Sequence, residues 1–139
     1  MSESTTRDYK IKKVKELRDI GINPYPNNFE IDCYLNQIRK KYDSTLEAEN
    51  ETDDYYKVAG RIVLKRDMGG LAFLTIQDED DRLQLTFLKK ELGEKYKLLK
   101  HFEVGDIIGV YGRVFKTKKG ELSIKVKEFE MLCKSLSEL

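Results

Sequence analysis

Two neighbouring stretches of alternating sequence bring side chains suited to nucleobase binding onto one face. In residues 71–78 and 82–87, one row of alternate positions is apolar and the other row is aromatic or polar. Alternate side chains of a strand point to opposite faces, so the second row faces outward if the first row forms a core. This outward row, called the platform below, contains Phe73, Thr75, Gln77, Arg82 and Gln84. A flat ring for stacking and planar polar groups for base edges are what recognition of unpaired bases requires.

The apolar row predicts the core of the same sheet. Its members are Ala72, Leu74 and Ile76 in the first stretch and Leu83, Leu85 and Phe87 in the second. The alternative interpretation is that a loop covers Phe73 and that the other platform residues are ordinary solvated surface. Antiparallel sheets commonly have one face in water, so the alternation alone leaves both interpretations open.

The charges are numerous but locally separated. Charged residues make up 37% of the 139-residue chain, yet the net charge is only +1. A polyanion could therefore be bound only where basic side chains are concentrated locally. Residues 43–54 contain acids and no base, and we expect them to form a solvated linker. Residues 113–120 contain basic side chains and no acid, so a polyanion could be bound here, unless this run is likewise a solvated loop.

Several classes of function are disfavoured by what the sequence contains. Cys33 and Cys133 lie far apart and outside any paired ligand spacing, so we expect buried or inert thiols and neither a disulfide framework nor a metal site. His101 has no nearby carboxylate or cysteine that would suggest a base-activated nucleophile, so we expect no catalysis by this segment. No apolar run approaches the length of a membrane span, and the polar start of the chain lacks a signal-peptide core. These features predict a cytoplasmic protein without membrane contact.

The periodicity changes from helical to alternating along the chain. Helical spacing predicts a helix over residues 5–20, ended by Gly21, and a shorter helix over residues 32–42 with Asp32 as its N-cap. Alternation predicts strands over residues 55–65, 71–78, 82–89, 106–116 and 121–132. One helix, over residues 90–101, is expected between the third and fourth strands.

This order of elements is that of an OB-fold, a Greek-key barrel whose second and third strands bind oligonucleotides. The predicted fold class is therefore an all-β core: a five-stranded OB-fold Greek-key barrel with N-terminal helices and one helix between strands three and four. Glycines within the strands, at positions 60, 109 and 112, suit the sharp bends of such a barrel. We expect residues 1–54 to form an N-terminal helical extension with the acidic linker, and residues 55–135 to form the OB-fold domain.

A series of short motifs resembles the N-terminal anticodon-binding domain of class II lysyl-tRNA synthetase. They extend over nearly the whole chain, and their order and spacing match that family rather than the related aspartyl and asparaginyl enzymes. They are Gly21-Ile22-Asn23-Pro24-Tyr25-Pro26, Val58-Ala59-Gly60-Arg61-Ile62, Lys65-Arg66, Met68-Gly69, Phe73, Thr75-Ile76-Gln77-Asp78, Leu83-Gln84-Leu85, Val104-Gly105-Asp106-Ile107-Ile108-Gly109-Val110, Phe115-Lys116-Thr117-Lys118-Lys119-Gly120-Glu121-Leu122-Ser123 and Leu132-Cys133-Lys134-Ser135-Leu136. Gly70, Leu71 and Ala72 depart from the family pattern, which usually has a lysine and a small residue here.

The resemblance implies a role for individual residues. Phe73 would stack on the central uridine of the lysine anticodon, and Arg66 and Gln84 would bind the edge of that base. Glu121 would contact a flanking anticodon base. The lysines that would hold backbone phosphates are Lys65, Lys116, Lys118 and Lys119.

The resemblance also implies a larger protein. Its parent would be an ATP-dependent lysine–tRNA ligase, a cytoplasmic homodimer that uses ATP and magnesium and binds lysine tRNA. This chain would be a non-catalytic fragment without cofactor, and we expect the catalytic domain to be absent from it. Two other hypotheses remain open: a sequence-tolerant single-stranded nucleic-acid-binding OB-fold protein, and a protein-interaction module whose basic N-terminal helix docks on another subunit.

Overall fold

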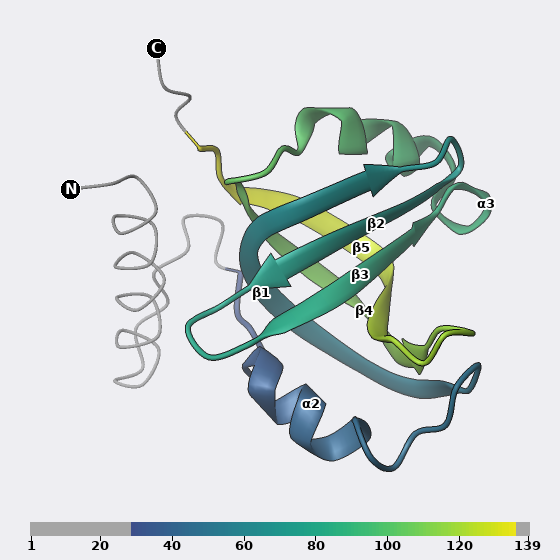
Figure 1. Cartoon of the computed structure of the whole chain (residues 1–139). Coiled ribbons are helices and arrows are strands. Elements are labelled where there is room, and N and C mark those ends of the chain that lie inside the picture. The colour runs from purple at the N-terminus through teal and green to yellow at the C-terminus, as the bar shows by residue number, and fades with distance from the viewer. Residues whose placement is uncertain (1–28, 136–139) are drawn as a thin grey trace.

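The computed structural model describes residues 29–135, and within them five strands close into a barrel (Figure 1). The strands are β1 (Glu51–Asp67), β2 (Leu71–Gln77), β3 (Arg82–Leu88), β4 (Ile107–Lys116) and β5 (Leu122–Cys133). They follow one another around the barrel in the order β1-β2-β3-β5-β4. β3 and β5 are parallel, and the other neighbouring pairs are antiparallel. The predicted five-stranded OB-fold barrel is confirmed.

The barrel interior is filled by the apolar rows of the strands. The six predicted core residues of β2 and β3 are all at 0% exposure. Apart from the small Ala72, burying each of these aliphatic or aromatic side chains contributes about 1.5 to 3 kcal/mol. The alternation read from the sequence therefore describes β2 and β3 correctly.

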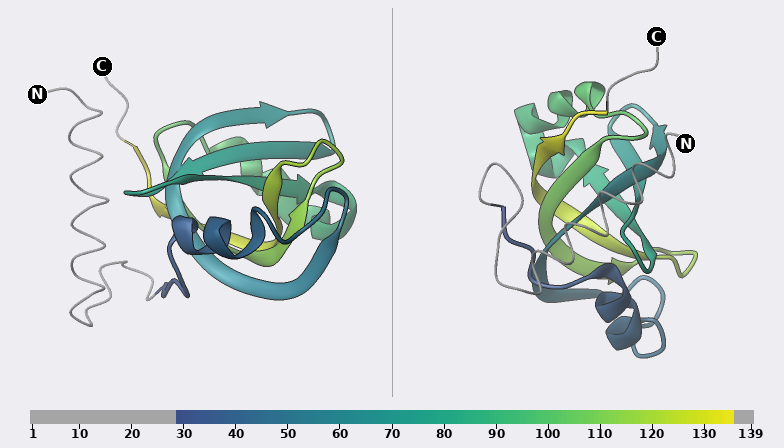
Figure 2. Two further views of the ribbon diagram at one scale, coloured as in Figure 1. Left: turned by 60° about the horizontal axis from the view of Figure 1, so that its bottom comes forward. Right: turned by 90° about the vertical axis from the view of Figure 1, so that its left-hand side faces the viewer.

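Helix α2 (Leu35–Tyr42) packs at one end of the barrel, and the segment between β3 and β4 packs at the other (Figures 1 and 2). Leu35, Ile38 and Tyr42 of α2 belong to the same hydrophobic cluster as the barrel interior. The prediction of Asp32 as N-cap is wrong. The backbone of Asp32 pairs with β1 instead, and the N–H of Leu35 donates to a carboxylate oxygen of Asp78 at 2.9 Å. The helix predicted over residues 5–20 lies outside the described residues.

The segment between β3 and β4 is a short α-helix followed by a 3₁₀-helix. They are α3 (Lys89–Leu92) and η1 (Gly93–His101), where the sequence predicts one continuous helix. Gly93 has a positive φ of 60°, a conformation that ends the α-helix because it is foreign to helices of L-residues. Tyr96 and Leu99 still pack into the barrel core, so the spacing of the apolar residues is compatible with both helix types.

The acidic run is not wholly a linker. β1 begins at Glu51, so the predicted boundary after residue 54 falls inside this strand. A carboxylate oxygen of Glu51 lies 2.8 Å from the guanidinium of Arg113, and its second oxygen lies 2.9 Å from the ammonium of Lys125. These hydrogen bonds, that of Lys125 foremost, hold the pKa of Glu51 below its ordinary value. The basic partners thus bring the end of the acidic run into the sheet.

Close approach of strands requires glycine on β4. A Cβ atom added to Gly112 would lie 2.2 Å from the carbonyl oxygen of Lys125 on β5. Glycine is therefore needed here for lack of space rather than for its backbone freedom. Over residues 29–135, no helix has the length and apolar character needed to cross a membrane.

Candidate nucleic-acid interface

Cross-strand register brings the platform residues together. Phe73 on β2 is paired with Arg66 on β1, and Thr75 is paired with Gln84 on β3. Residues directly opposite each other have Cβ atoms about 4.5 to 5.5 Å apart, and diagonal neighbours lie about 7 to 8 Å apart. Arg66 is therefore directly opposite Phe73 on β1, whereas on β3 the residue opposite Phe73 is Thr86 and Gln84 is its diagonal neighbour.

The platform faces away from the barrel core. Phe73, Thr75, Gln77 and Gln84 are half-buried, and Arg82 is exposed, whereas their sequence neighbours on β2 and β3 are buried or turned inward. Phe73 thus does not belong to the hydrophobic core clusters of the described residues. This orientation agrees with the sequence prediction.

Hydrogen bonds hold the strands below the platform in register. The Ser123 hydroxyl on β5 donates to the carbonyl oxygen of Gln84 at 3.1 Å and lies 2.8 Å from the hydroxyl of Thr86. At the edge of the platform, Arg82 Nε donates to Gln77 Oε1 at 2.7 Å. Neighbouring polar groups are thus fixed to one another before any ligand binds, which lowers the entropic cost of binding.

A β-bulge decides which charged residue of β1 reaches the platform. The register with β2 shifts between Ile62 and Leu64, and after the shift Arg66 is opposite Phe73 while Lys65 is opposite the inward residue Leu74. Lys65 and Arg66 therefore leave the strand on opposite faces.

The ammonium of Lys65 has partners within the protein, which argues against the phosphate-binding role predicted for this residue. Its ammonium donates to the carbonyl oxygens of Leu99 at 2.7 Å and Phe102 at 2.8 Å. These carbonyls end the 3₁₀-helix η1, where a cation is favourable. Lys65 fastens η1 to β1 and does not lie on the platform.

The basic run is divided between structural contacts and exposed side chains. The Lys116 ammonium donates to the carbonyl oxygen of Asp43 at 2.6 Å, which joins the end of β4 to the end of α2. Lys118 and Lys119 are exposed in the turn that leads to β5. The ammonium groups of these two lysines are accessible to phosphates. The ammonium of Lys116 instead binds the main chain at the end of α2.

Glu121 stands exposed just before β5. Its backbone N–H donates to the hydroxyl of Thr117 at 3.0 Å, which fixes the turn. One carboxylate oxygen lies 3.6 Å from Nη2 of Arg39 on α2. Arg39 received no role from sequence reasoning, because a single arginine in a basic helix gives no signal of what it contacts.

The turn between β2 and β3 is built around Asp78. One carboxylate oxygen of Asp78 accepts the backbone N–H groups of Asp80 and Asp81, each at 3.0 Å. A hollow of about 240 Å³ extends over residues 77–82 beside the platform. Its acidic side chains repel phosphates, so we expect the nucleobases rather than the phosphate backbone of a nucleic acid to approach this edge.

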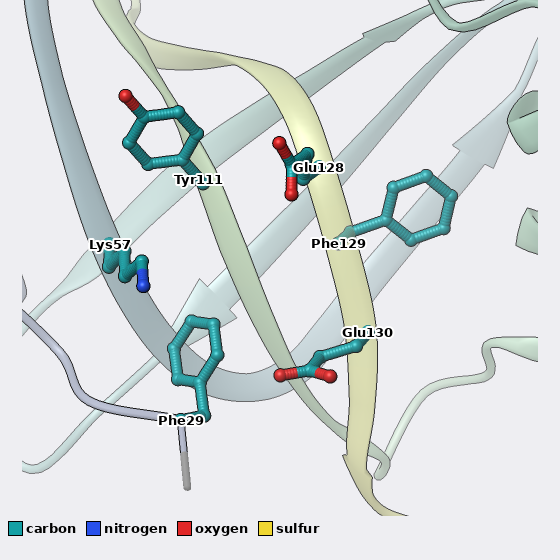
Figure 3. Close-up of a pocket in the computed structure, with 6 residues that line it drawn as sticks. All are labelled: Phe29, Lys57, Tyr111, Glu128, Phe129 and Glu130. Atoms are coloured by element: carbon teal, nitrogen blue, oxygen red, sulfur yellow. The ribbon is translucent and has the colours of Figure 1, made fainter. Parts of the chain in front are cut away.

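A second hollow of about 360 Å³ lies on β1, β4 and β5 (Figure 3). It is lined by Phe29, Lys57, Tyr111, Glu128, Phe129 and Glu130. The ring of Phe129 points to the other side of β5, where it contacts the rings of Phe87 and Phe102. Two carboxylates accompany one ammonium here, so this hollow suits nucleic acid less well than the platform does.

The thiols and the histidine form no reactive cluster. Burial, with smaller contributions from Asp32 and Asp78, raises the pKa of Cys33 to about 11, so this thiol stays protonated at neutral pH. Cys133 is free and exposed. His101 is exposed at the end of η1. Among the described residues, no group of histidine, cysteine or acidic side chains has an arrangement that could hold a metal ion.

Comparison with known proteins identifies the barrel independently. Residues 56–132 match the family model of the OB-fold nucleic acid binding domain. The chain is 44% identical over 131 residues to a lysine–tRNA ligase of Actinobacillus pleuropneumoniae serotype 5b (strain L20), which covers 92% of this chain and 26% of the relative. It is 39% identical over 145 residues to the lysine–tRNA ligase of Syntrophomonas wolfei, which covers 100% of this chain and 28% of the relative. The lysine–tRNA ligase of Magnetococcus marinus is 40% identical over 129 residues, covering 91% of this chain and 26% of the relative.

The chain spans about a quarter of the length of these relatives. The family match covers the barrel, and the similarity to the ligases extends beyond it toward both ends of the chain. The chain therefore belongs to the family of OB-fold nucleic acid binding domains, in the form that is found in lysine–tRNA ligases.

Proposed function

We propose that this chain is the anticodon-recognition module of a lysine–tRNA ligase. The observation that carries the proposal is the register that sets Arg66 opposite Phe73 and Gln84 opposite Thr75, on a face turned away from the core. The similarity to lysine–tRNA ligases supports lysine tRNA as the RNA in this proposal. The module binds and does not catalyse.

Phe73 stacks on the central anticodon base, and its two neighbours read the base edge. Stacking of a base on an aromatic side chain contributes about 1 to 3 kcal/mol. The amide of Gln84 both donates and accepts, so it can match uracil, but by turning over it could also match the reversed pattern of cytosine. Arg66 can only donate, so it favours the carbonyl oxygen of uracil over the amino group of cytosine. A mismatched edge leaves buried polar groups unsatisfied, at a cost of about 1 to 3 kcal/mol.

Contacts outside the central base supply the remaining affinity. Glu121 approaches a base that flanks the central position. Lys118 and Lys119 hold phosphates of the anticodon loop, which adds affinity without sequence information and makes binding sensitive to salt. Lys65 and Lys116 have no part in this proposal, because their ammonium groups bind backbone carbonyls.

The activity of the whole protein is part of the same proposal. The parent protein joins lysine to its tRNA with ATP and magnesium, in the cytoplasm, as a homodimer. In this proposal the described residues bind the anticodon loop and take no part in the reaction. The reaction takes place in another part of the parent protein.

Binding of anticodon stem-loop RNA tests the proposal. Fluorescence anisotropy at moderate salt compares a hairpin that carries the lysine anticodon with one whose central uridine is changed to cytidine. We expect tighter binding of the uridine hairpin and a loss of about 5-fold to 150-fold in affinity for Phe73→Ala, the factor that stacking represents. Tyr111→Ala is the matched control, since it removes a half-buried aromatic ring from the outer side of β4.

Two outcomes would contradict the proposal. Equal affinity for the two hairpins, with strong salt dependence, would favour the sequence-tolerant single-strand binder. Unchanged affinity of Phe73→Ala, with Tyr111→Ala equally unaffected, would show that the platform does not contact the RNA.

A further inference from the structure

One arginine on α2 joins three segments that are distant in the sequence. Arg39 Nε donates to the carbonyl oxygen of Arg82 at 2.8 Å and lies 3.4 Å from a carboxylate oxygen of Asp81. Its Nη2 lies 3.6 Å from a carboxylate oxygen of Glu121, and its Nη1 lies 3.2 Å from one of Asp43, the residue that follows α2. The guanidinium therefore connects α2, the turn between β2 and β3, and the residue that precedes β5.

The position of Glu121 relative to the platform follows from the strand register. Parallel pairing sets Gln84 beside Ser123, so Glu121 lies two residues earlier, level with Arg82 at the platform edge. The side chain of Arg39 is 24% exposed and that of Glu121 is 50% exposed. The arginine is thus held by the backbone of β3, while the carboxylate keeps access to solvent and to a ligand.

The geometry leaves Glu121 free to accept a further hydrogen bond. An ionised carboxylate has about four acceptor positions on its two oxygens. Arg39 approaches one oxygen of Glu121, which limits the rotation of the carboxylate without using all of its acceptor positions. A planar guanidinium is well suited to this, because its donors have a fixed relative direction.

Arg39 also balances the local charge. Among the described residues, the carboxylates of Asp43, Asp81 and Glu121 lie within 3.6 Å of this one guanidinium. Loss of the arginine would leave three negative charges at the edge of a surface that must receive an RNA. The same side chain therefore affects both the direction of Glu121 and the potential met by phosphates.

We infer that Arg39 is a positioning residue that orients the Glu121 carboxylate toward a base flanking the central anticodon position. This inference rests on the proposed function. The arginine acts through Glu121 and does not itself read the base. An ordinary exposed ion pair would instead add about 0 to 1 kcal/mol to stability and leave specificity unchanged.

The test is a double-mutant cycle read as base discrimination. The discrimination ratio is the affinity for the lysine-anticodon hairpin divided by that for a hairpin with one flanking base changed, measured for each flanking position and for the central position. We expect Glu121→Gln to lower one flanking ratio by about tenfold, the size of one lost hydrogen bond to a charged acceptor. We expect Arg39→Ala to lower the same ratio by a similar factor, and the double variant to fall no further.

Two further variants separate charge from direction. Arg39→Lys keeps the positive charge but loses the planar guanidinium, whose donors have fixed relative directions. We therefore expect hairpin binding to depend on salt as in the wild type, while the discrimination ratio at the flanking base is lowered. Lys97→Ala is the control, since it removes an exposed ion pair with Glu94 on η1. We expect this control to leave all the discrimination ratios and the salt dependence of binding unchanged.

The failure of this inference differs from the failure of the proposed function. Loss of central-base discrimination in the wild type would overturn the proposed function. With central discrimination intact, four results would overturn the role of Arg39: no flanking discrimination in the wild type, no effect of Glu121→Gln, additive effects in the cycle, or a lowered melting temperature of Arg39→Ala with an unchanged flanking ratio. Equal losses at all three positions would show a general effect on binding and would also overturn it.

Discussion

Replacing Lys65 with methionine distinguishes a structural lysine from one that binds phosphate. Methionine keeps most of the aliphatic side chain and removes the ammonium. In the folded protein this ammonium donates to two carbonyl oxygens at 2.7 and 2.8 Å, one from the last turn of η1 and one just after it. Lys65→Met therefore removes the direct connection between β1 and the end of η1.

The expected loss of stability follows from these two bonds. A hydrogen bond that involves a charged group contributes about 1.5 to 3 kcal/mol. Lys65 is half-buried, so water replaces part of what is lost, and we expect a net loss of about 2 kcal/mol. For a domain of about 100 residues, this corresponds to a melting temperature lower by about 8 to 16 °C.

Two measurements check this reasoning. Thermal unfolding by circular dichroism should show the lower melting temperature, and hairpin binding below that temperature should keep the wild-type dependence on salt. Lys118→Met is the matched control, because Lys118 is exposed in the turn before β5. We expect that control to keep its stability within about 0.5 kcal/mol and to lower the salt slope by about 0.7 to 0.9. An unchanged melting temperature of Lys65→Met together with a reduced salt slope would refute the structural role.

Three further predictions concern the strands. Gly112→Ala introduces a methyl group 2.2 Å from the Lys125 carbonyl, so we expect denaturant unfolding to show a loss of more than about 1 kcal/mol, and an unchanged midpoint would contradict the close approach. Because hydrogen bonds from its basic partners, Lys125 foremost, lower the pKa of Glu51, its contribution to stability is complete above the ordinary glutamate value of about 4.3 and declines as the pH falls below that value. The stability difference between wild type and Glu51→Gln should therefore shrink on acidification, and a difference that grows would reverse the sign. Leu64 is 53% exposed and Ile62 is 0% exposed. Leu64→Gln should therefore change the free energy of unfolding by less than about 0.5 kcal/mol. Ile62→Gln should leave the barrel unfolded, so that a thermal scan shows no unfolding transition.

Local alternation was enough to predict β2, β3 and the platform. Every second residue from Ala72 to Ile76 is apolar, and the same holds from Leu83 to Phe87, so each face can be assigned without knowing its partner. The antiparallel pairing of β2 with β3 then follows from the short connection between them. Phe73 and Gln84 could therefore be placed on one face before the barrel was known.

Contacts between distant residues could not be predicted in this way. Asp32 has the residue type and position of an N-cap, yet the first helical N–H of α2 is bound by Asp78, 43 residues further along the chain. Glu51 belongs to an acidic run that is typical of a linker, and two basic side chains from β4 and β5 bring it into the sheet. In both cases a tertiary contact outweighs a local preference. One hydrogen bond to a charged group contributes more free energy than the conformational propensity of a single residue.

The bulge in β1 shows how one residue changes the function read from a strand. Residues 62–64 are all apolar, which conflicts with a strand whose neighbouring rows are alternately buried and wet. The register shift at this point leaves one residue unpaired, so that Leu64 faces outward. Because a shift by one residue exchanges the faces of all later side chains, Lys65 turns inward to η1 and Arg66 turns outward beside Phe73. Strict alternation would have exchanged these two cations, so the proposed base-binding arrangement depends on a register that only the pairing with β2 defines.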